Sequence, residues 1–135
     1  MDIKKLAQEV FEIESKEIAN LSKRLTDDFE KAINAILQSS GKLIVSGMGK
    51  SGIIGKKIAA TLASTGTPSF FLHPGEAYHG DLGMIEENDI VLLISNSGET
   101  DEVLKLIPFL KHQKNCTISM TVLNFAKTSA ESPGF

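Results

Sequence analysis

Apolar residues recur every three or four positions through the first 38 residues, a segment that contains neither glycine nor proline. This spacing gathers the apolar side chains on one stripe of a helix. Asp27, with Glu30 three positions later, has the pattern of a helix start, so a break near Thr26 is compatible with the segment. Gly41 ends the helical pattern. The stripe consists of Ile3, Leu6, Val10, Ile13, Leu21, Leu25, Phe29, Ile33 and Ile36. We therefore expect an N-terminal helical region over residues 1–38.

Beyond Gly41 the pattern changes to short apolar runs separated by glycine-rich or polar segments. The predicted buried strands cover residues 42–46, 69–72, 89–94 and 116–121. Helical periodicity returns over residues 53–64 and 99–111, and the second helix contains Pro108. Residues 73–87 have no period, which predicts a long loop with one helical turn. The alternation of strands and helices predicts an α/β fold, a parallel sheet flanked by helices on both faces.

The composition is that of an ordinary folded domain. The chain has 135 residues, of which 41% are hydrophobic and 23% charged, with a formal net charge of −3. These values fit one domain with a continuous core. A pI near 5.6 gives no basic surface for nucleic acid, and no apolar run approaches the ~20 residues that cross a membrane. Cys116 is the only cysteine, which excludes an internal disulfide and predicts a cytoplasmic protein.

The glycine-rich segment at residues 47–52 lies between a predicted strand and a predicted helix. It has the spacing G-x-G-x-x-G, but a dinucleotide site needs an acidic residue about 20 positions later, where Leu72 and His73 stand. A nucleotide-triphosphate loop would need glycine at the position of Ile44. A helix start of this kind binds anions through backbone amides. A tight turn without a ligand is the alternative, and Lys50 in the turn argues against it.

Hydroxyl side chains gather in a second loop, residues 95–100, which again joins a strand to a helix. Many neutral donors at a helix start suit a phosphate monoester, although capping by Ser97 alone would also account for part of the pattern. In open α/β sheets, ligands bind where the carboxyl ends of such strands meet. The hydroxyls that we predict to bind phosphate are Ser51, Ser95, Ser97 and Thr100.

Residues 73–81 contain two of the three histidines together with Glu76 and Asp81. Histidine and carboxylate side chains can ligate zinc, but the spacing of His73 and His79 matches no standard zinc motif. A role in binding substrate hydroxyls and a purely structural role therefore remain open.

Together these segments resemble the sugar isomerase (SIS) domain of D-arabinose 5-phosphate isomerases, including capsule-expression and lipopolysaccharide-pathway members. The resemblance runs from about Ile3 to Met120. It rests on residues 45–52 (VSGMGKSG), 63–71 (ASTGTPSFF), 73–77 (HPGEA), 79–83 (HGDLG) and 94–99 (ISNSGE). It implies a flavodoxin-like three-layer fold and the aldose–ketose interconversion of D-ribulose 5-phosphate and D-arabinose 5-phosphate through an enediol. Arabinose 5-phosphate is the precursor of 3-deoxy-D-manno-octulosonate (Kdo) in Gram-negative bacteria.

The resemblance also implies roles for individual residues. Lys50 and Glu102 correspond to catalytic positions of the family, His79 to a substrate-contacting position, and Gly66 with Thr67 to a substrate-binding pair. His73 corresponds to a position that binds zinc, which inhibits family members rather than assisting them, so no cofactor is expected to be required. Family members are tetramers with sites near subunit boundaries, which implies a homo-oligomer.

The sequence departs from the family pattern after residue 121. Family members continue with a further helix and strand, a loop, and a Ser-His-Pro-Gly-Gly motif that supply a second catalytic glutamate and a catalytic histidine. Many also carry paired CBS modules, and this sequence has neither feature. We expect residues 1–121 to form a partial SIS domain, incomplete at its C-terminus as in a truncation, and residues 122–135 to be an unmatched, disordered tail. Weak substrate binding and poor turnover would follow.

A different functional class remains as an alternative, namely a regulatory SIS module that binds a sugar phosphate without converting it. A DNA-binding regulator would carry a basic helix-turn-helix ahead of the domain. Residues 1–38 instead form an acidic-to-neutral amphipathic helix, which favours the isomerase.

Overall fold

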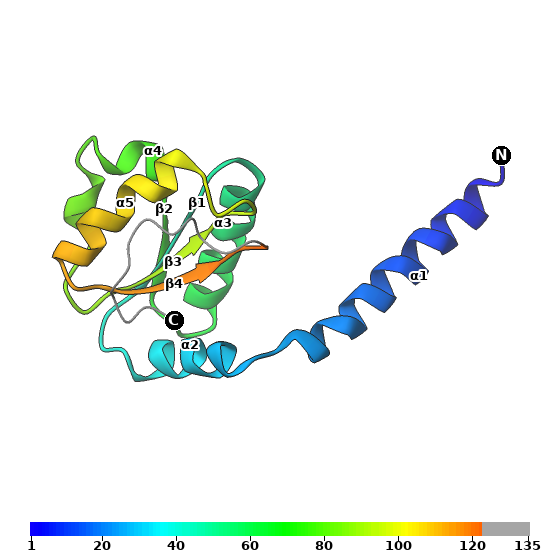
Figure 1. Cartoon of the computed structure of the whole chain (residues 1–135), viewed down its shortest axis with the longest axis horizontal. Coiled ribbons are helices and arrows are strands. Elements are labelled where there is room, and N and C mark those ends of the chain that lie inside the picture. Colours follow the sequence, from blue (N-terminus) through cyan, green and yellow to red (C-terminus); the bar gives the residue numbers. More distant parts are fainter. Residues whose placement is uncertain (123–135) are drawn as a thin grey trace. The chain divides into compact units, whose positions relative to one another are not determined.

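The computed structural model describes residues 1–122 and divides the chain into two units, Met1–Lys31 and a second unit that begins at Ala32 (Figure 1). The predicted tail, apart from Val122, lies outside the described residues. Each unit is described below by itself.

The first unit is helical. Helix α1 (Ile3–Leu21) begins after Asp2, whose Oδ1 accepts a hydrogen bond from the Lys5 amide at 3.1 Å. A 3₁₀ turn (Ser22–Arg24) follows, and helix α2 (Asp27–Gln38) then begins, so the break predicted near Thr26 is present. Apart from the half-buried Asn20, every side chain of α1 is exposed, the apolar stripe included.

The second unit is built on a four-stranded parallel sheet with the order β2-β1-β3-β4 (Figure 1). The strands are β1 (Leu43–Gly47), β2 (Ser69–Leu72), β3 (Ile90–Ile94) and β4 (Cys116–Met120), close to the predicted ranges. The chain leaves β1 toward β2 and later returns to the other side of β1 to form β3. The strand order therefore reverses between β1 and β3, where open α/β sheets bind ligands.

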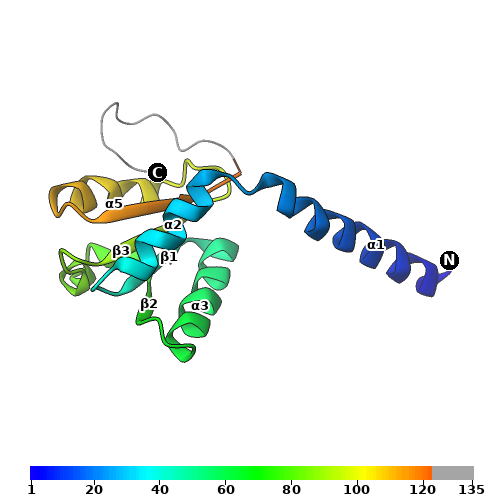
Figure 2. The same ribbon diagram turned by 90° about the horizontal axis from the view of Figure 1, so that it is seen from below.

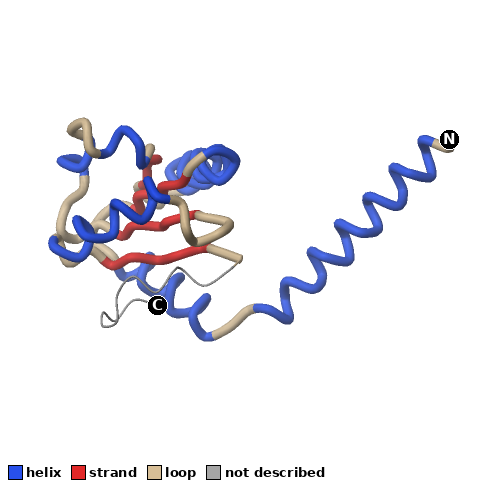
Figure 3. The backbone as a smooth tube through the Cα atoms, turned by 45° about the horizontal axis from the view of Figure 1, so that its top comes forward, coloured by secondary structure: helices blue, strands red, loops and turns tan. Residues whose placement is uncertain are grey.

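Helices cover both faces of this sheet, as predicted (Figures 2 and 3). Helix α3 (Gly49–Ser64) and the later residues of α2 pack on one face, which is lined by Val45, Leu92 and Ile94. Helices α4 (Pro74–Ala77) and α5 (Asp101–His112) pack on the other, and a 3₁₀ turn (Asp81–Met84) lies between α4 and β3. The two cores account for the continuous burial of β1 and β3.

Helix α3 begins at Gly49, four residues before the predicted start. Gly49 has φ +55°, a left-handed value that glycine adopts without strain, and this lets the helix begin directly after the strand. Gly52 and Gly55 then allow a close approach to the sheet, because a Cβ atom on Gly52 would lie 2.6 Å from the Gly47 carbonyl oxygen. A Cβ atom on Gly55 would lie 3.1 Å from Phe71. Lys50 is thereby part of a helical turn rather than of a loop.

A buried carboxylate joins the strands at the amino edge of the sheet. The Oδ1 atom of Asp89 accepts a hydrogen bond from the Lys42 amide at 2.7 Å, and its Oδ2 atom accepts one from the Glu86 amide at 2.8 Å. Lys42 Nζ lies 3.1 Å from Glu86 and 3.5 Å from Asp89. Hydrogen bonding to Glu86, reinforced by Asp89, raises the pKa of Lys42 above its ordinary value.

Candidate functional site

The carboxyl ends of β1 and β3 bring the two predicted anion-binding segments to the point where the strand order reverses. Gly47 pairs with Ile94 at the ends of the two strands, so residues 48–52 and 95–100 leave the sheet side by side. Neighbouring strands in a sheet are about 4.8 Å apart. The sequence prediction that these segments share one edge of the sheet is thus confirmed by the topology.

The first turn of α3 presents backbone amides and a cation at this edge. Met48 precedes the helix in an extended conformation, and its side chain cannot cap the helix. Its carbonyl oxygen accepts the Gly52 amide at 3.1 Å, the first bond of the helix. The amides of the three residues between them point out of the helix start, as in any first turn. Lys50 is exposed and Ser51 half-buried in that turn.

The loop after β3 is held by its own hydroxyl groups. Ser95 Oγ is 2.9 Å from Thr100 Oγ1 and accepts the Gly98 amide at 3.0 Å, while Ser97 Oγ accepts the Glu99 amide at 3.1 Å. Ser95 is buried and Ser97 is exposed. Since one proton suffices for the bond between Ser95 and Thr100, the second proton of that pair remains for a ligand.

The helix starts at this edge differ from two others in the chain. Asp2 caps α1 and His73 caps α4 through their side chains, whereas among the described residues no side chain caps α3 or α5. Thr100 occupies the capping position of α5, but its hydroxyl is bonded to Ser95 instead. Two uncapped helix starts at one edge provide amide donors and partial positive charge for an anion.

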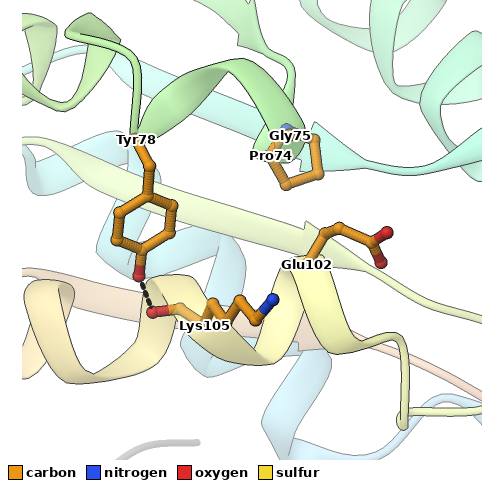
Figure 4. A pocket seen from close by; sticks show the side chains of 5 residues that line it. All are labelled: Pro74, Gly75, Tyr78, Glu102 and Lys105. Atoms are coloured by element: carbon orange, nitrogen blue, oxygen red, sulfur yellow. Dashed lines mark hydrogen bonds between the residues drawn. The ribbon is translucent and has the colours of Figure 1, made fainter.

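Glu102 lies in the first turn of α5 and borders a pocket of about 360 Å³ between α4 and α5 (Figure 4). The pocket is lined by Pro74, Gly75, Tyr78, Glu102 and Lys105. Glu102 is half-buried, and its side chain extends on the side of the pocket away from Tyr78. A carboxylate in this position can exchange a proton with a ligand that enters from the edge of the sheet.

His73 follows β2 and has a structural partner. Its Nδ1 atom accepts the Gly75 amide at 3.2 Å, and its ring meets the Phe71 ring edge-on at 6.5 Å. Within residues 1–122, no group of three or more histidine, cysteine or acidic side chains is arranged to hold a metal ion. Zinc binding at His73 therefore stays a prediction.

Comparison with known proteins decides the family. Residues 36–132 match the family model described as SIS domain. This chain belongs to the SIS domain family. Arabinose 5-phosphate isomerase KdsD of Yersinia pestis is 56% identical over 121 residues, which cover 90% of this chain and 37% of the relative. Arabinose 5-phosphate isomerase KpsF of Escherichia coli O6:H1 is 57% identical over 109 residues, which cover 80% of this chain and 33% of the relative.

A solved structure agrees with these relatives. An Escherichia coli CFT073 protein in complex with arabinose 5-phosphate superposes with a TM-score of 0.79 at 42% identity, covering 94% of this chain and 69% of that one. The comparisons confirm the predicted resemblance and the SIS-type fold. The chain spans about a third of the length of the curated relatives that it matches.

The SIS domain gathers most of the predicted site residues at one edge. The exceptions are Gly66 and Thr67, which follow the C-terminal end of α3 and precede β2, and therefore lie at the opposite edge of the sheet. The Thr67 amide there bonds to the Leu62 carbonyl at 2.9 Å, and Gly66 has φ +103°. His79 is exposed and follows Tyr78 after α4. The roles of these residues in substrate binding stay predictions.

Two further residues border Glu102 in this SIS domain: Lys105, which the family resemblance includes in a substrate-binding stretch over residues 105–114, and Tyr78, which sequence reasoning did not select. Lys105 follows Glu102 by three positions in a predicted helix, a spacing that places both on one face. Tyr78 is the only tyrosine of the chain and gave no comparable indication, because its neighbour in space lies 27 residues away. In the described part of the chain no helix is long and apolar enough to cross a membrane.

Proposed function

We propose that this SIS domain interconverts D-ribulose 5-phosphate and D-arabinose 5-phosphate as part of an arabinose 5-phosphate isomerase, and that the product serves Kdo synthesis. The observation that carries the proposal is the placement of Lys50, Glu102 and two uncapped helix starts at the same edge of the sheet. Identity of 56–57% to proteins named arabinose 5-phosphate isomerases supports the choice of substrate. A structural relative in complex with arabinose 5-phosphate supports it as well.

In the proposed reaction the phosphate group is bound by the amides of α3 and α5 with the hydroxyls of Ser51, Ser97 and the Ser95–Thr100 pair. Glu102 removes a proton from C1 of ribulose 5-phosphate, and the C2 carbonyl becomes the oxyanion of an enediolate. Lys50 stabilises that oxyanion. A proton moves from the C1 hydroxyl to the C2 oxygen and another is returned to C2, which yields the aldose. No step requires a metal ion.

We further propose that the 135-residue polypeptide turns substrate over slowly. The resemblance assigns a second glutamate and a histidine to the reaction, and the sequence after residue 121 lacks the motifs that carry them. Proton transfer by a positioned side chain contributes about 10²–10⁴-fold to a rate, so loss of such groups lowers turnover without preventing binding. A cytoplasmic location is proposed from the lone cysteine.

Deuterium incorporation tests the proposed activity even when turnover is slow. In D₂O the chain is incubated with ribulose 5-phosphate, and arabinose 5-phosphate that carries deuterium at C2 is detected by NMR. We expect incorporation in the natural sequence and a loss of at least about 100-fold in Glu102→Gln. Glu87→Gln, an exposed carboxylate that follows the 3₁₀ turn, is the matched control and should keep the natural rate. Binding of arabinose 5-phosphate without incorporation would favour the regulatory module, and absence of binding would contradict both functions.

We also propose that the protein self-associates. All apolar side chains of the α1 stripe are exposed in the single chain, and a patch of this kind is usually covered in an assembly. The family resemblance implies a tetramer.

A further inference from the structure

Tyr78 connects the two helices that border the pocket at Glu102. It is the residue directly after α4, and its hydroxyl donates a hydrogen bond to the backbone carbonyl oxygen of Lys105 in α5 (Figure 4). Lys105 lies one helical turn after Glu102. The bond therefore joins the end of α4 to the outer side of α5, one turn after Glu102.

The part of α5 that carries Glu102 depends on such contacts more than an uninterrupted helix would. Pro108 has no amide proton, so the helical bond that would end at the Leu104 carbonyl is missing. The helix has only 12 residues, and isolated helices of about that length are marginal in water. Val103 and Leu106 are buried and fix the inner face of α5 against the sheet. The outer face of α5, which carries Glu102 and Lys105, is instead held by contacts with α4 on the other side of the pocket.

On the other side of the pocket, helix α4 is held in place by a side-chain cap and by buried residues. His73 caps its first turn, Pro74 is buried, and Ala77 belongs to the same core as Val103 and Leu106. Tyr78 extends from the end of this short helix and is 52% exposed, so the ring itself contributes little to the core. Its hydroxyl bond to Lys105 adds a polar link between the two walls of the pocket on their outer side, beyond the apolar packing of Ala77.

We propose that Tyr78 is a positioning residue for Glu102. Its hydroxyl fixes the first half of α5 relative to α4 and so sets where the Glu102 carboxylate stands when it exchanges a proton with the sugar phosphate. The proposal rests on the proposed function, because that function assigns the proton transfer to Glu102. Effective proton transfer requires a heavy-atom distance of about 2.6–3.2 Å, so a loosened α5 should lower the rate more than the affinity.

Tyr78→Phe removes the hydroxyl and keeps the ring. Ser69→Ala is the matched control, because the Ser69 hydroxyl also donates to a helix carbonyl, that of Ala59 at 2.7 Å, but on the opposite face of the sheet. Two readouts are compared in the full chain. The first is hydrogen exchange of the α5 amides without ligand. The second is the rate of deuterium exchange at C2 of arabinose 5-phosphate in D₂O, measured as a function of the concentration of that sugar phosphate.

We expect Tyr78→Phe to speed amide exchange in the first half of α5 and to lower the saturating C2 exchange rate about three- to tenfold, the effect of one hydrogen bond. The half-saturating concentration of arabinose 5-phosphate should change less than twofold. Ser69→Ala should alter neither α5 exchange nor the C2 rate. A merely structural role would predict no change in the saturating rate at temperatures well below unfolding.

Each result decides between the two proposals. Unchanged α5 exchange in Tyr78→Phe would overturn the positioning role whether or not the protein binds arabinose 5-phosphate. Faster α5 exchange with an unaltered C2 rate would overturn it as well. If the natural sequence neither binds arabinose 5-phosphate nor exchanges its C2 proton, the proposed function fails and the role of Tyr78 toward Glu102 fails with it. Binding to the natural sequence and to Ser69→Ala can be followed separately through the fluorescence of Tyr78, because the chain has one tyrosine and no tryptophan.

Discussion

His73 has a structural role at a position for which the family resemblance implies metal binding. Its Nδ1 atom caps α4, and only Nε2 remains for another partner. The same helix carries Pro74 and Gly75, which line the pocket at Glu102. A change at His73 therefore acts on the site through the position of α4, independently of any ligand.

Asparagine separates these two roles, because it is a good capping residue. We expect His73→Ala to lower the free energy of unfolding by about 1 kcal/mol through loss of the cap. His73→Asn should stay within about 0.5 kcal/mol of the natural protein. Urea unfolding followed by circular dichroism measures both. Equal stability losses in the two variants would show that capping is not the role of His73. If zinc binds at this position, both variants should also lose inhibition by zinc.

At the scale of elements, the contact between α3 and the sheet is the part of the site that the sequence described least well. The glycines at 47, 49 and 52 predicted a loop, because glycine is a poor helix former. The structure uses Gly52 and Gly55 inside the helix, where the lack of a side chain permits close packing on Gly47 and Phe71. The need for glycine at these positions comes from packing between α3 and the sheet. A single sequence does not show which residues the glycines will pack against.

Alanine substitutions measure that requirement. A methyl group at Gly52 would lie 2.6 Å from a backbone oxygen and at Gly55 3.1 Å from Phe71, so α3 must shift. We expect each variant to lose about 1–3 kcal/mol of unfolding free energy and Gly52→Ala to bind arabinose 5-phosphate more weakly, since Lys50 moves with the helix. Gly83→Ala is the control, because nothing lies within 4 Å of its added methyl. Urea unfolding that shows equal stability for all three variants would contradict the packing argument.

The ion pairs of Lys42 link the start of β1 to the segment before β3. They make the stability of this link depend on pH. Because Glu86 and Asp89 raise the pKa of Lys42 above 10.5, its contribution to stability is fully present below about pH 10.5. The contribution is lost as the pH rises through the raised pKa. We expect Lys42→Met to flatten the stability profile above pH 10, compared with Lys57→Met at an exposed position. Thermal unfolding between pH 8 and about 11.5 measures this, and parallel profiles for both variants would refute it.

At the scale of the whole molecule, the sequence predicted the sheet well and the arrangement of site residues in part. The strands agree because each is a short apolar run, and Lys50 and Glu102 share an edge because both follow parallel strands. Gly66 and Thr67 show the limit of this reasoning. The family resemblance groups them with Lys50 and Glu102 as site residues. The topology places them at the opposite edge of the sheet from Lys50 and Glu102. Motif membership therefore says little about distance within one chain.

The exposed stripe of α1 leads to a prediction about assembly. Leu6 and Ile13 are 47% and 63% exposed in the single chain, and burying each in an interface would contribute about 1.5–3 kcal/mol. We expect sedimentation at micromolar concentration to show an oligomer. The double variant Leu6→Lys with Ile13→Lys should weaken association by at least about 100-fold. Gln8→Lys with Ser15→Lys adds the same charge on the opposite side of the helix and should leave the oligomer intact. A natural protein that sediments as a monomer, or equal effects of the two double variants, would show that the stripe does not mediate assembly.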